Sequence, residues 1–287
     1  MDTVFFKLSL SVRVAEAPCK TKLTVPFEQL VEWAAELGYQ AVCLRPSVVG
    51  VHSPPEQWEQ VRRTLEQYGL SVSMVTADFD VPLNNERGPR ALRKIGPTLE
   101  LAQTLGADLV RVCLKKDEDI EYARAAAEQA AQHGIRLAHQ SHTCSLFETV
   151  EGSLKTLRAI DRSNFGIIYE PANLVLCGQP YGVDTLKAFR PYLFNVYVQN
   201  LVVEPEGPVP WETWCRGAVR FRRLALWEPG GVDFACVLDG LRQVGYNGYV
   251  TVHQPAENGG SPYEAAKRSA EFLRQLAEEI GPKGTAV

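Results

Sequence analysis

The chain has 287 residues, of which 45% are hydrophobic and 22% are charged, and its formal net charge is -4. This composition is ordinary for a soluble globular protein, and the length suits one large α/β domain. No basic stripe is present and the sequence pI is about 5.8, so we expect no nucleic-acid partner.

The cysteine pattern and the N-terminal run bear on the compartment. The seven cysteines are scattered and form no Cys-x-x-Cys pair, which predicts reduced thiols and a cytoplasmic location. The run from Val4 to Leu10 alternates like a strand and is interrupted by Lys7. We therefore expect neither a signal peptide nor a membrane span.

Helix-like stretches end repeatedly at a glycine, and a short apolar strand begins two or three residues later. The five glycines concerned are Gly38, Gly69, Gly106, Gly134 and Gly245. A glycine just past a helix end adopts the left-handed conformation that stops the helix. Recurrence at roughly thirty-residue intervals predicts a repeating helix-then-strand unit.

The predicted strands, in chain order, cover residues 5–12, 41–45, 70–76, 109–114, 135–140, 165–170, 193–199 and 249–253. The first predicted helix begins at Pro26, with Thr24 as its candidate cap. Further helices are predicted over residues 54–68, 89–105 (with Pro97 as a candidate kink), 119–133, 145–160, 184–189, 233–244 and 263–280. This alternation predicts a single (β/α)8 TIM-barrel domain over residues 1–287.

Residues 200–230 form a segment longer than the connections usual in such a fold. Loops beyond roughly a dozen residues are usually functional or disordered. This one carries three tryptophans and four arginines: Trp211, Trp214, Trp227, Arg216, Arg220, Arg222 and Arg223. It follows the seventh strand on the active-site side, and we expect either a lid over the substrate or a surface excursion that contacts another subunit.

Polar side chains end four consecutive strands. Side chains alternate between the two faces of a strand, so the outward Val250 and Val252 place His253 inside the barrel. The same reasoning directs Gln140, Glu170, Tyr197 and Gln199 inward. A carboxylate and an imidazole that converge in a barrel mouth can act as base and acid or as metal ligands. The alternative is a ring of polar residues hydrated by water.

Four further residues are weaker candidates. His142 follows the fifth strand and either reaches the mouth or lies on the surface. Arg216 either clamps a carboxylate or phosphate or is a solvated loop charge. Asp78 and Asp80 are expected to be loop-capping residues.

Several stretches, in this order along the chain, resemble the xylose isomerase-like TIM barrels, specifically the sugar phosphate isomerase/epimerase group. They are Leu37-Gly38-Tyr39, Gly106-Ala107-Asp108-Leu109-Val110-Arg111-Val112, Tyr169-Glu170-Pro171-Ala172-Asn173, Tyr197-Val198-Gln199-Asn200, Leu226 to Phe234, and Gly245-Tyr246-Asn247-Gly248-Tyr249. The resemblance covers most of the chain.

The resemblance implies one divalent cation held by a Glu, an Asp, a His and a Glu at the ends of strands five to eight. These positions correspond to Gln140, Glu170, Tyr197 and His253, and none keeps the family's residue. The negative charge of the set falls from three to one, which weakens affinity for a hard cation. We expect at most one divalent or transition metal ion (Mn, Zn, Fe or Mg), held by Glu170, His253 and Gln140, and no nucleotide cofactor.

The resemblance implies an isomerase or epimerase of sugar metabolism, with a lyase as a variant. Its substrate would be a small polyol, keto-sugar or hydroxy-carbonyl compound, and its reaction a proton transfer next to a carbonyl. Glu170, His253 and Tyr197 would be catalytic, and the substrate would be bound by Gln140, His142, Gln199 and Arg216.

Two other functions remain as alternatives. A non-catalytic sugar-binding or interaction protein would explain the lost metal ligands. A DNA-repair endonuclease with a zinc cluster is disfavoured by the acidic chain and its five histidines. Homo-oligomers are common for this architecture, and the tryptophans of residues 200–230 are a candidate contact.

Overall fold

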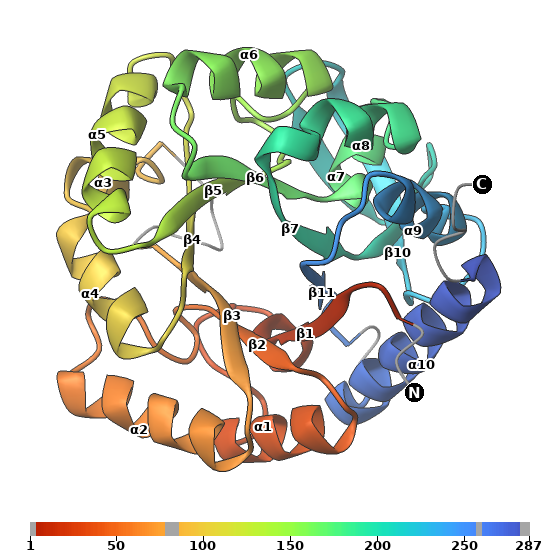
Figure 1. The fold of residues 1–287 in the computed structure, drawn as a ribbon. Coiled ribbons are helices and arrows are strands. Elements are labelled where there is room, and N and C mark those ends of the chain that lie inside the picture. The colour runs from red at the N-terminus through yellow and green to blue at the C-terminus, as the bar shows by residue number, and fades with distance from the viewer. Residues whose placement is uncertain (1–3, 78–85, 257–259, 282–287) are drawn as a thin grey trace, which may run out of the picture.

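Eight parallel strands close into a barrel in the computed structural model, which describes residues 4–77, 86–256 and 260–281 (Figure 1). Around the barrel the order is β1-β11-β7-β6-β5-β4-β3-β2. The strands are β1 (Lys7–Ser11), β2 (Ala41–Leu44), β3 (Ser71–Thr76), β4 (Leu109–Val112), β5 (Arg136–Gln140), β6 (Phe165–Tyr169), β7 (Leu193–Val198) and β11 (Tyr249–Val252). The predicted (β/α)8 barrel is confirmed.

Helices surround the barrel and alternate with its strands (Figure 1). They are α1 (Phe27–Glu36), α2 (Pro55–Gln67), α3 (Arg90–Arg93), α4 (Gly96–Thr104), α5 (Asp119–Ala131), α6 (Val150–Ile160), α7 (Pro171–Leu176), α8 (Val183–Phe189), α9 (Phe234–Gln243) and α10 (Pro262–Ile280). Two short 3-10 helices, η1 (Val12–Ala15) and η2 (Arg190–Tyr192), complete the set in the described residues. The five predicted helix-ending glycines all have φ between 67° and 73°, as the left-handed conformation requires.

Some predicted helix boundaries were wrong. The helix expected over residues 89–105 is two helices, α3 and α4, and Pro97 lies in the first turn of α4, where a missing N–H costs nothing. Thr24 does not cap α1, because its hydroxyl donates to the carbonyl of Ala15 at 3.0 Å. The helix expected from residue 145 begins at Val150, capped by Thr149. The short helix α7 was not predicted.

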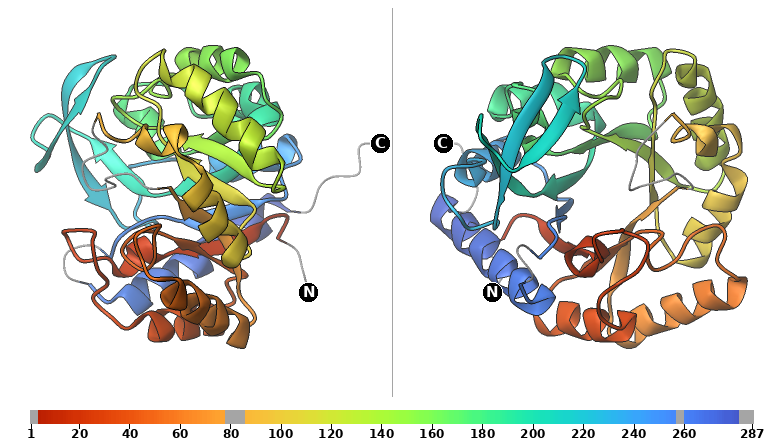
Figure 2. Two further views of the ribbon diagram at one scale, coloured as in Figure 1. Left: turned by 90° about the vertical axis from the view of Figure 1, so that its left-hand side faces the viewer. Right: turned by 180° about the vertical axis from the view of Figure 1, so that it is seen from behind.

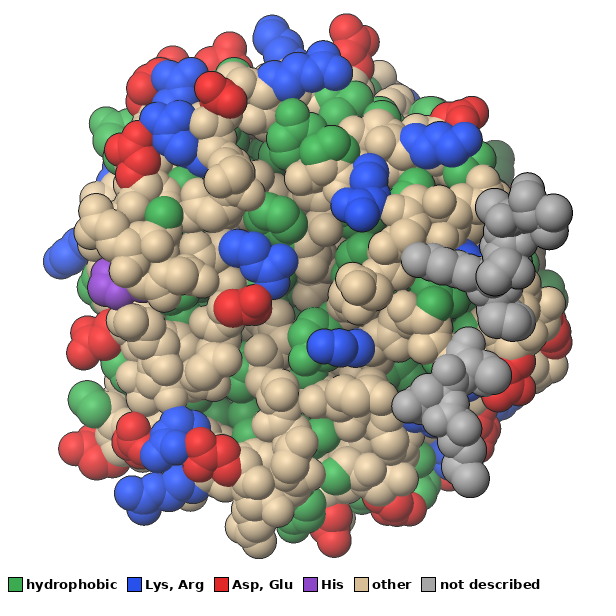
Figure 3. All heavy atoms as spheres, viewed as in Figure 1, with side chains coloured by type: hydrophobic (Ala, Val, Ile, Leu, Met, Phe, Trp, Pro, Cys, Tyr) green, Lys and Arg blue, Asp and Glu red, His purple; other side chains and the backbone are tan. Residues whose placement is uncertain are grey.

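Residues 200–230, expected as a loop, hold a small antiparallel sheet. Its strands are β8 (Asn200–Val203), β9 (Val209–Thr213) and β10 (Gly217–Leu224), in the order β8-β10-β9. The hairpin of β9 and β10 projects beyond the end of the barrel where the strands finish (Figure 2). At the opposite end of the barrel, where the strands begin, charged side chains of both signs are interspersed on the surface (Figure 3).

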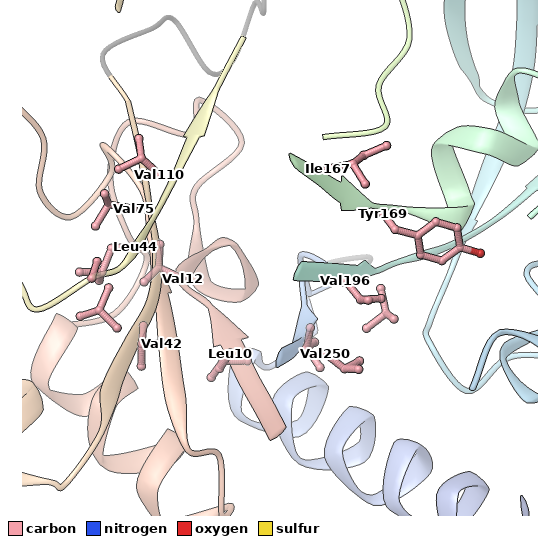
Figure 4. Close-up of a cluster of buried hydrophobic side chains, with 14 of the residues drawn as sticks. Leu10, Val12, Val42, Leu44, Val75, Val110, Ile167, Tyr169, Val196 and Val250 are labelled. Atoms are coloured by element: carbon pink, nitrogen blue, oxygen red, sulfur yellow. The ribbon is translucent and has the colours of Figure 1, made fainter. Parts of the chain in front are cut away.

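The barrel strands separate an outer apolar layer from a polar-ended interior. Leu10, Val42, Ile167 and Val250 belong to the core cluster between strands and helices (Figure 4). A second cluster fills the barrel itself, from Cys43, Met74, Leu109, Ala138, Ile168 and Tyr197. The alternation predicted for the last four strands is therefore confirmed, and it directs the side chains that follow these strands toward the mouth.

Two further expectations concern chain segments rather than the barrel. No helix within the described ranges has the length and apolar character that crossing a membrane requires. Asp78 and Asp80 lie outside the described residues.

Candidate active site at the barrel mouth

A cavity of about 80 Å³ lies at the carboxyl ends of the barrel strands. Its polar walls include Gln140 from the end of β5, Gln199 just after β7 and His253 just after β11. Trp211 of β9 and Phe221 of β10 line it from the hairpin. A cavity needs roughly 10–15 Å³ to hold one water molecule, so this one has room for several waters or a few ligand atoms.

Glu170 lies directly behind this cavity and is fully buried. It follows β6, and Pro171 starts α7 immediately after it. Its Oε2 accepts hydrogen bonds from the amides of Gln140 and Asn173, both of which line the cavity. Its Oε1 has no hydrogen-bond partner among the described residues. Burial raises the pKa of Glu170 to about 7, although nearby Arg13 opposes the shift.

His253 lines the cavity but is held as a neutral imidazole. Its ring stacks on that of Tyr197, with centroids 3.8 Å apart. Its Nδ1 lies 3.0 Å from the hydroxyl of Ser11, and its Nε2 lies 3.5 Å from a guanidinium nitrogen of Arg45. Burial, followed by the charges of Arg13 and Arg45, lowers the pKa of His253 well below its ordinary value. A protonated His253 acting as the acid is therefore disfavoured.

The remaining predicted site residues divide into two groups. Gln199 and His142 line the cavity, and burial lowers the pKa of His142 to about 3. The hydroxyl of Tyr197 instead lies inside the barrel, 3.3 Å from the sulfur of Cys43. Arg216 does not line the cavity, and its guanidinium donates to the carbonyl of Leu176, at the end of α7, at 3.3 Å.

Five cationic side chains line the cavity, and sequence reasoning did not select them as site residues. They are Arg13 of η1, Lys20 in the loop that follows, Arg45 after β2, Arg111 of β4 and Arg223 of β10. Arg111 lies between Val110 and Val112, which pack in the outer layer, so strand alternation would have directed it inward. Arg111 was not predicted because candidate site residues were taken only from strands five to eight.

Within residues 4–77, 86–256 and 260–281, few carboxylates balance these cations. Glu16 pairs with Arg45 at 2.7 Å, and both side chains are 2% exposed. Burial and the charge of Arg45 lower the pKa of Arg13 to about 10. Burial and the charge of Arg13 lower the pKa of Lys20 to about 8. Among the described residues, the mouth therefore carries excess positive charge.

The residues at the mouth do not fit a divalent cation. Of Gln140, Glu170, Tyr197 and His253, the four positions expected from the resemblance to correspond to metal ligands, only Glu170 supplies negative charge. The Nε2 of His253 faces Arg45, and the hydroxyl of Tyr197 points into the barrel. Arg111 and Arg45 are close enough to Glu170 to lower its pKa, so a metal ion here would meet guanidinium groups. Divalent cations favour anionic oxygen or neutral nitrogen ligands, and this set offers too few.

Another group of potential ligands lies outside the mouth. The ligand atoms of Glu148, Cys177 and Cys215 lie within 4.8 Å of one another. The carboxylate of Glu148 already accepts hydrogen bonds from the backbone N–H groups of Cys144, Trp214 and Cys215, at 2.8 to 3.0 Å. Two thiols and this engaged carboxylate fall short of the four ligands of a structural zinc site.

Known proteins resemble the chain over nearly its whole length. The rhizopine catabolism protein MocC of Rhizobium meliloti is 24% identical over 285 residues, which cover 89% of this chain and 83% of that protein. The crystal structure of the probable 3-DHS dehydratase AsbF from Bacillus anthracis superposes with a TM-score of 0.69 at 19% identity, covering 94% of this chain and 99% of that one. A xylose isomerase-like TIM barrel protein from Mycobacterium smegmatis, solved in complex with magnesium, has a TM-score of 0.69 at 17% identity and covers 96% of this chain and 97% of its own.

The family assignment rests on a match of sequence pattern rather than of fold alone. The sequence model described as "Xylose isomerase-like TIM barrel" matches residues 31–276, which is most of the chain. The structural neighbours include a sugar phosphate isomerase/epimerase from Parabacteroides distasonis with the same fold. The chain therefore belongs to the xylose isomerase-like TIM barrel family.

Proposed function

We propose that this protein is an enzyme that transfers a proton next to the carbonyl of a small hydroxy-carbonyl compound. The products would be those of isomerisation, of epimerisation or of elimination of water. The observation that carries the proposal is Glu170, a buried carboxyl with a pKa of about 7 behind a polar cavity. A base with a pKa near the operating pH transfers protons well, and catalytic carboxyls are tuned in this way.

The reaction would begin with a movement of Gln140. Glu170 does not itself line the cavity, whereas Gln140, which donates to it, does. An entering substrate would displace the Gln140 amide and expose the carboxylate. The C–H bond next to the carbonyl then breaks, its proton goes to Glu170, and its electron pair moves to the carbonyl oxygen.

The second half of the reaction decides the product. Glu170 returns the proton to a neighbouring carbon for isomerisation. Epimerisation instead needs a second proton donor, such as water in the cavity, on the opposite face of the same carbon, and Glu170 keeps the proton that it removed. For elimination, the electron pair returns from the oxygen and forms a C=C bond, and the β-hydroxyl leaves as water with the proton that Glu170 removed. The negative oxygen of the intermediate is stabilised by the guanidinium of Arg111, which lines the same cavity. His253 acts as a neutral hydrogen-bonding group rather than as an acid.

The relatives support a range of reactions rather than one. AsbF is described as a probable dehydratase, and the structural neighbours of this chain include a D-allulose 3-epimerase. Elimination and epimerisation both begin by removing a proton next to a carbonyl. The shared first step is therefore the part of the proposal that the family best supports.

A non-catalytic binding protein is the alternative. It is favoured by the sealed position of Glu170, which is separated from the cavity by Gln140 and Asn173. In that case the cavity would bind its ligand without any proton leaving a carbon.

Hydrogen exchange in D2O tests catalysis directly. A panel of keto-sugars, hydroxy acids and sugar phosphates would be incubated with the protein and examined by NMR for deuterium next to the carbonyl. We expect exchange with at least one class, a rate that rises as the pH passes about 7, and a loss of 100-fold or more in Glu170→Gln. Glu271→Gln, on the exposed face of α10, is the matched control. No exchange with any compound, or full activity in Glu170→Gln, would contradict the proposal.

A further inference from the structure

We infer that the cationic side chains at the mouth bind an anionic group of the substrate, a carboxylate or a phosphate ester, without a metal ion. The inference rests on the proposed function for the identity of this cavity as the substrate site. It deepens that function by assigning the substrate class.

The charge around the cavity is the first observation. Arg13, Lys20, Arg45, Arg111 and Arg223 all line it. The described carboxylates that act on Arg13 and Lys20 are Glu16, which is paired with Arg45, and, for Arg13, the buried Glu170. Arg13 and Lys20 are partly withdrawn from water and only partly neutralised, which is costly, and a bound oxyanion would remove that cost.

Among the residues that the structure describes, three of these cations lack the carboxylate partner that several surface arginines have. Surface arginines such as Arg62, Arg124 and Arg162 each lie within 2.5–2.7 Å of a glutamate oxygen. Within the described ranges, no carboxylate lies at ion-pair distance from Arg13 or Arg223, nor from Lys20. Guanidinium groups hold carboxylates and phosphates by paired hydrogen bonds, so these side chains are suited to an external oxyanion.

The position of the three unpaired cations indicates how the substrate lies. Arg13, Lys20 and Arg223 line both the inner cavity and a larger outer groove of about 680 Å³. An anionic group held at this junction leaves the inner cavity of about 80 Å³ for the hydroxy-carbonyl part. That part would then face Arg111 and Gln140, in front of Glu170. The substrate is therefore a small hydroxy-carbonyl compound with a terminal carboxylate or phosphate.

Calorimetric titration of the purified protein tests the anion site. The probes are inorganic phosphate, malonate and neutral xylitol, each at constant ionic strength set with chloride. We expect phosphate or malonate to bind saturably in the millimolar range or tighter, and xylitol at least tenfold more weakly. Preference for phosphate would indicate a phosphate ester as the substrate, and preference for malonate a carboxylate.

A double variant and a matched control show where the anion binds. Arg13→Gln/Arg223→Gln should weaken binding at least tenfold. Arg222→Gln should stay within twofold of the unmodified protein, because Arg222 adjoins Arg223 on β10 but pairs with Glu204 at 3.0 Å and does not line the cavity. The exposed Arg223→Gln alone is used if the double variant fails to fold. Absence of saturable binding, or equal binding by the cavity variants, would overturn the inference.

Failure of this inference can be told apart from failure of the proposed function. Anion binding without deuterium exchange in any compound would support the anion site and contradict the enzymatic function. Deuterium exchange into a neutral keto-sugar, with the same kcat/KM in the Arg223→Gln variant as in the unmodified protein, would overturn the anion site and support the enzymatic function.

Discussion

Lys20 has an uncommon backbone conformation and an altered ionisation at the rim of the cavity. Its φ is 58°, in the left-handed region that residues other than glycine rarely adopt. The charged groups that act on it are Arg13, Arg45 and Arg223, with Glu16 as the opposing carboxylate. Burial and these cations lower its pKa to about 8. Strained residues cluster at functional sites, which is consistent with a role for Lys20 in holding a ligand.

We predict that anion binding weakens as Lys20 loses its proton. The ammonium is present below pH 8 and absent well above it, so the affinity for malonate should fall several-fold between pH 7 and 9.5. Malonate is the probe because its own charge does not change in this range. Lys20→Met should bind malonate more weakly at pH 7 and show a flatter pH dependence. The exposed Lys22→Met should titrate like the unmodified protein, and an equally steep dependence in Lys20→Met would contradict the prediction.

Some site residues were predictable from sequence and others were not. Gln140, Glu170 and His253 were found because alternation along buried parallel strands is strict. Arg111 obeys the same rule and was missed only because its strand was not considered. Lys20 carries no such signal, because it lies in an irregular loop that reaches the mouth through tertiary packing.

At the scale of elements, hydrogen bonds at the turn of the β9–β10 hairpin hold the hairpin against the barrel. The buried carboxylate of Glu148 accepts N–H groups from Trp214 and Cys215 in the turn, at 2.8 and 3.0 Å. The indole N–H of Trp211 donates to the hydroxyl of Thr143 at 2.8 Å. These contacts hold Trp211 against the cavity that it lines, as a lid or wall requires.

We predict that Glu148→Ala loosens this hairpin. The substitution leaves N–H groups in the turn without their acceptor and should cost roughly 1–3 kcal/mol of the unfolding free energy. Amide hydrogen exchange over residues 209–217 should become faster, and malonate should bind more weakly. Glu212→Gln, an exposed change on β9, should leave both measurements unaltered. Unchanged exchange in Glu148→Ala would show that other contacts hold the hairpin.

The barrel elements were predictable and the hairpin was not, for a physical reason. Each barrel strand is an apolar run that follows a glycine-stopped helix, so two independent signals agree. In β10, Val219 and Phe221 alternate with Arg220 and Arg222, which is the signal of a half-buried strand. Because residues 200–230 were interpreted as a connection between two barrel strands, this alternation alone did not predict a strand. The exposed face of β10 and its short partners give no further support.

At the scale of the whole molecule, charge is distributed unevenly despite a net charge of -4. Five cationic side chains line the mouth, whereas charges of both signs are mixed on the opposite end (Figure 3). A cleft lined by one sign of charge concentrates counter-ions and speeds their association, more so at low salt. The distribution therefore favours the entry of an anionic substrate at this end.

Buried histidines make the stability of the whole fold depend on pH. Burial lowers the pKa values of His139 and His142 to about 3, and that of His253 well below its ordinary value. In the unfolded chain these groups take up protons below about pH 6.5, so acid favours unfolding. Glu170 acts in the opposite direction, because its raised pKa adds stability that is present at low pH and lost as the pH rises through about 7. The three histidines together change the unfolding free energy more than the one carboxyl does, so acid destabilises the fold.

We predict that the unfolding free energy falls as the pH drops from 6.5 to 5, with a net uptake of roughly two protons on unfolding. Urea unfolding at several pH values gives this slope. His139→Phe keeps the stacking on Phe147, whose ring lies parallel at 4.3 Å, but removes one titrating group. Its slope should be lower by about one proton, whatever its absolute stability. The exposed His133→Gln should retain the full slope, and the same slope in His139→Phe would show that His139 is not a source of the acid sensitivity.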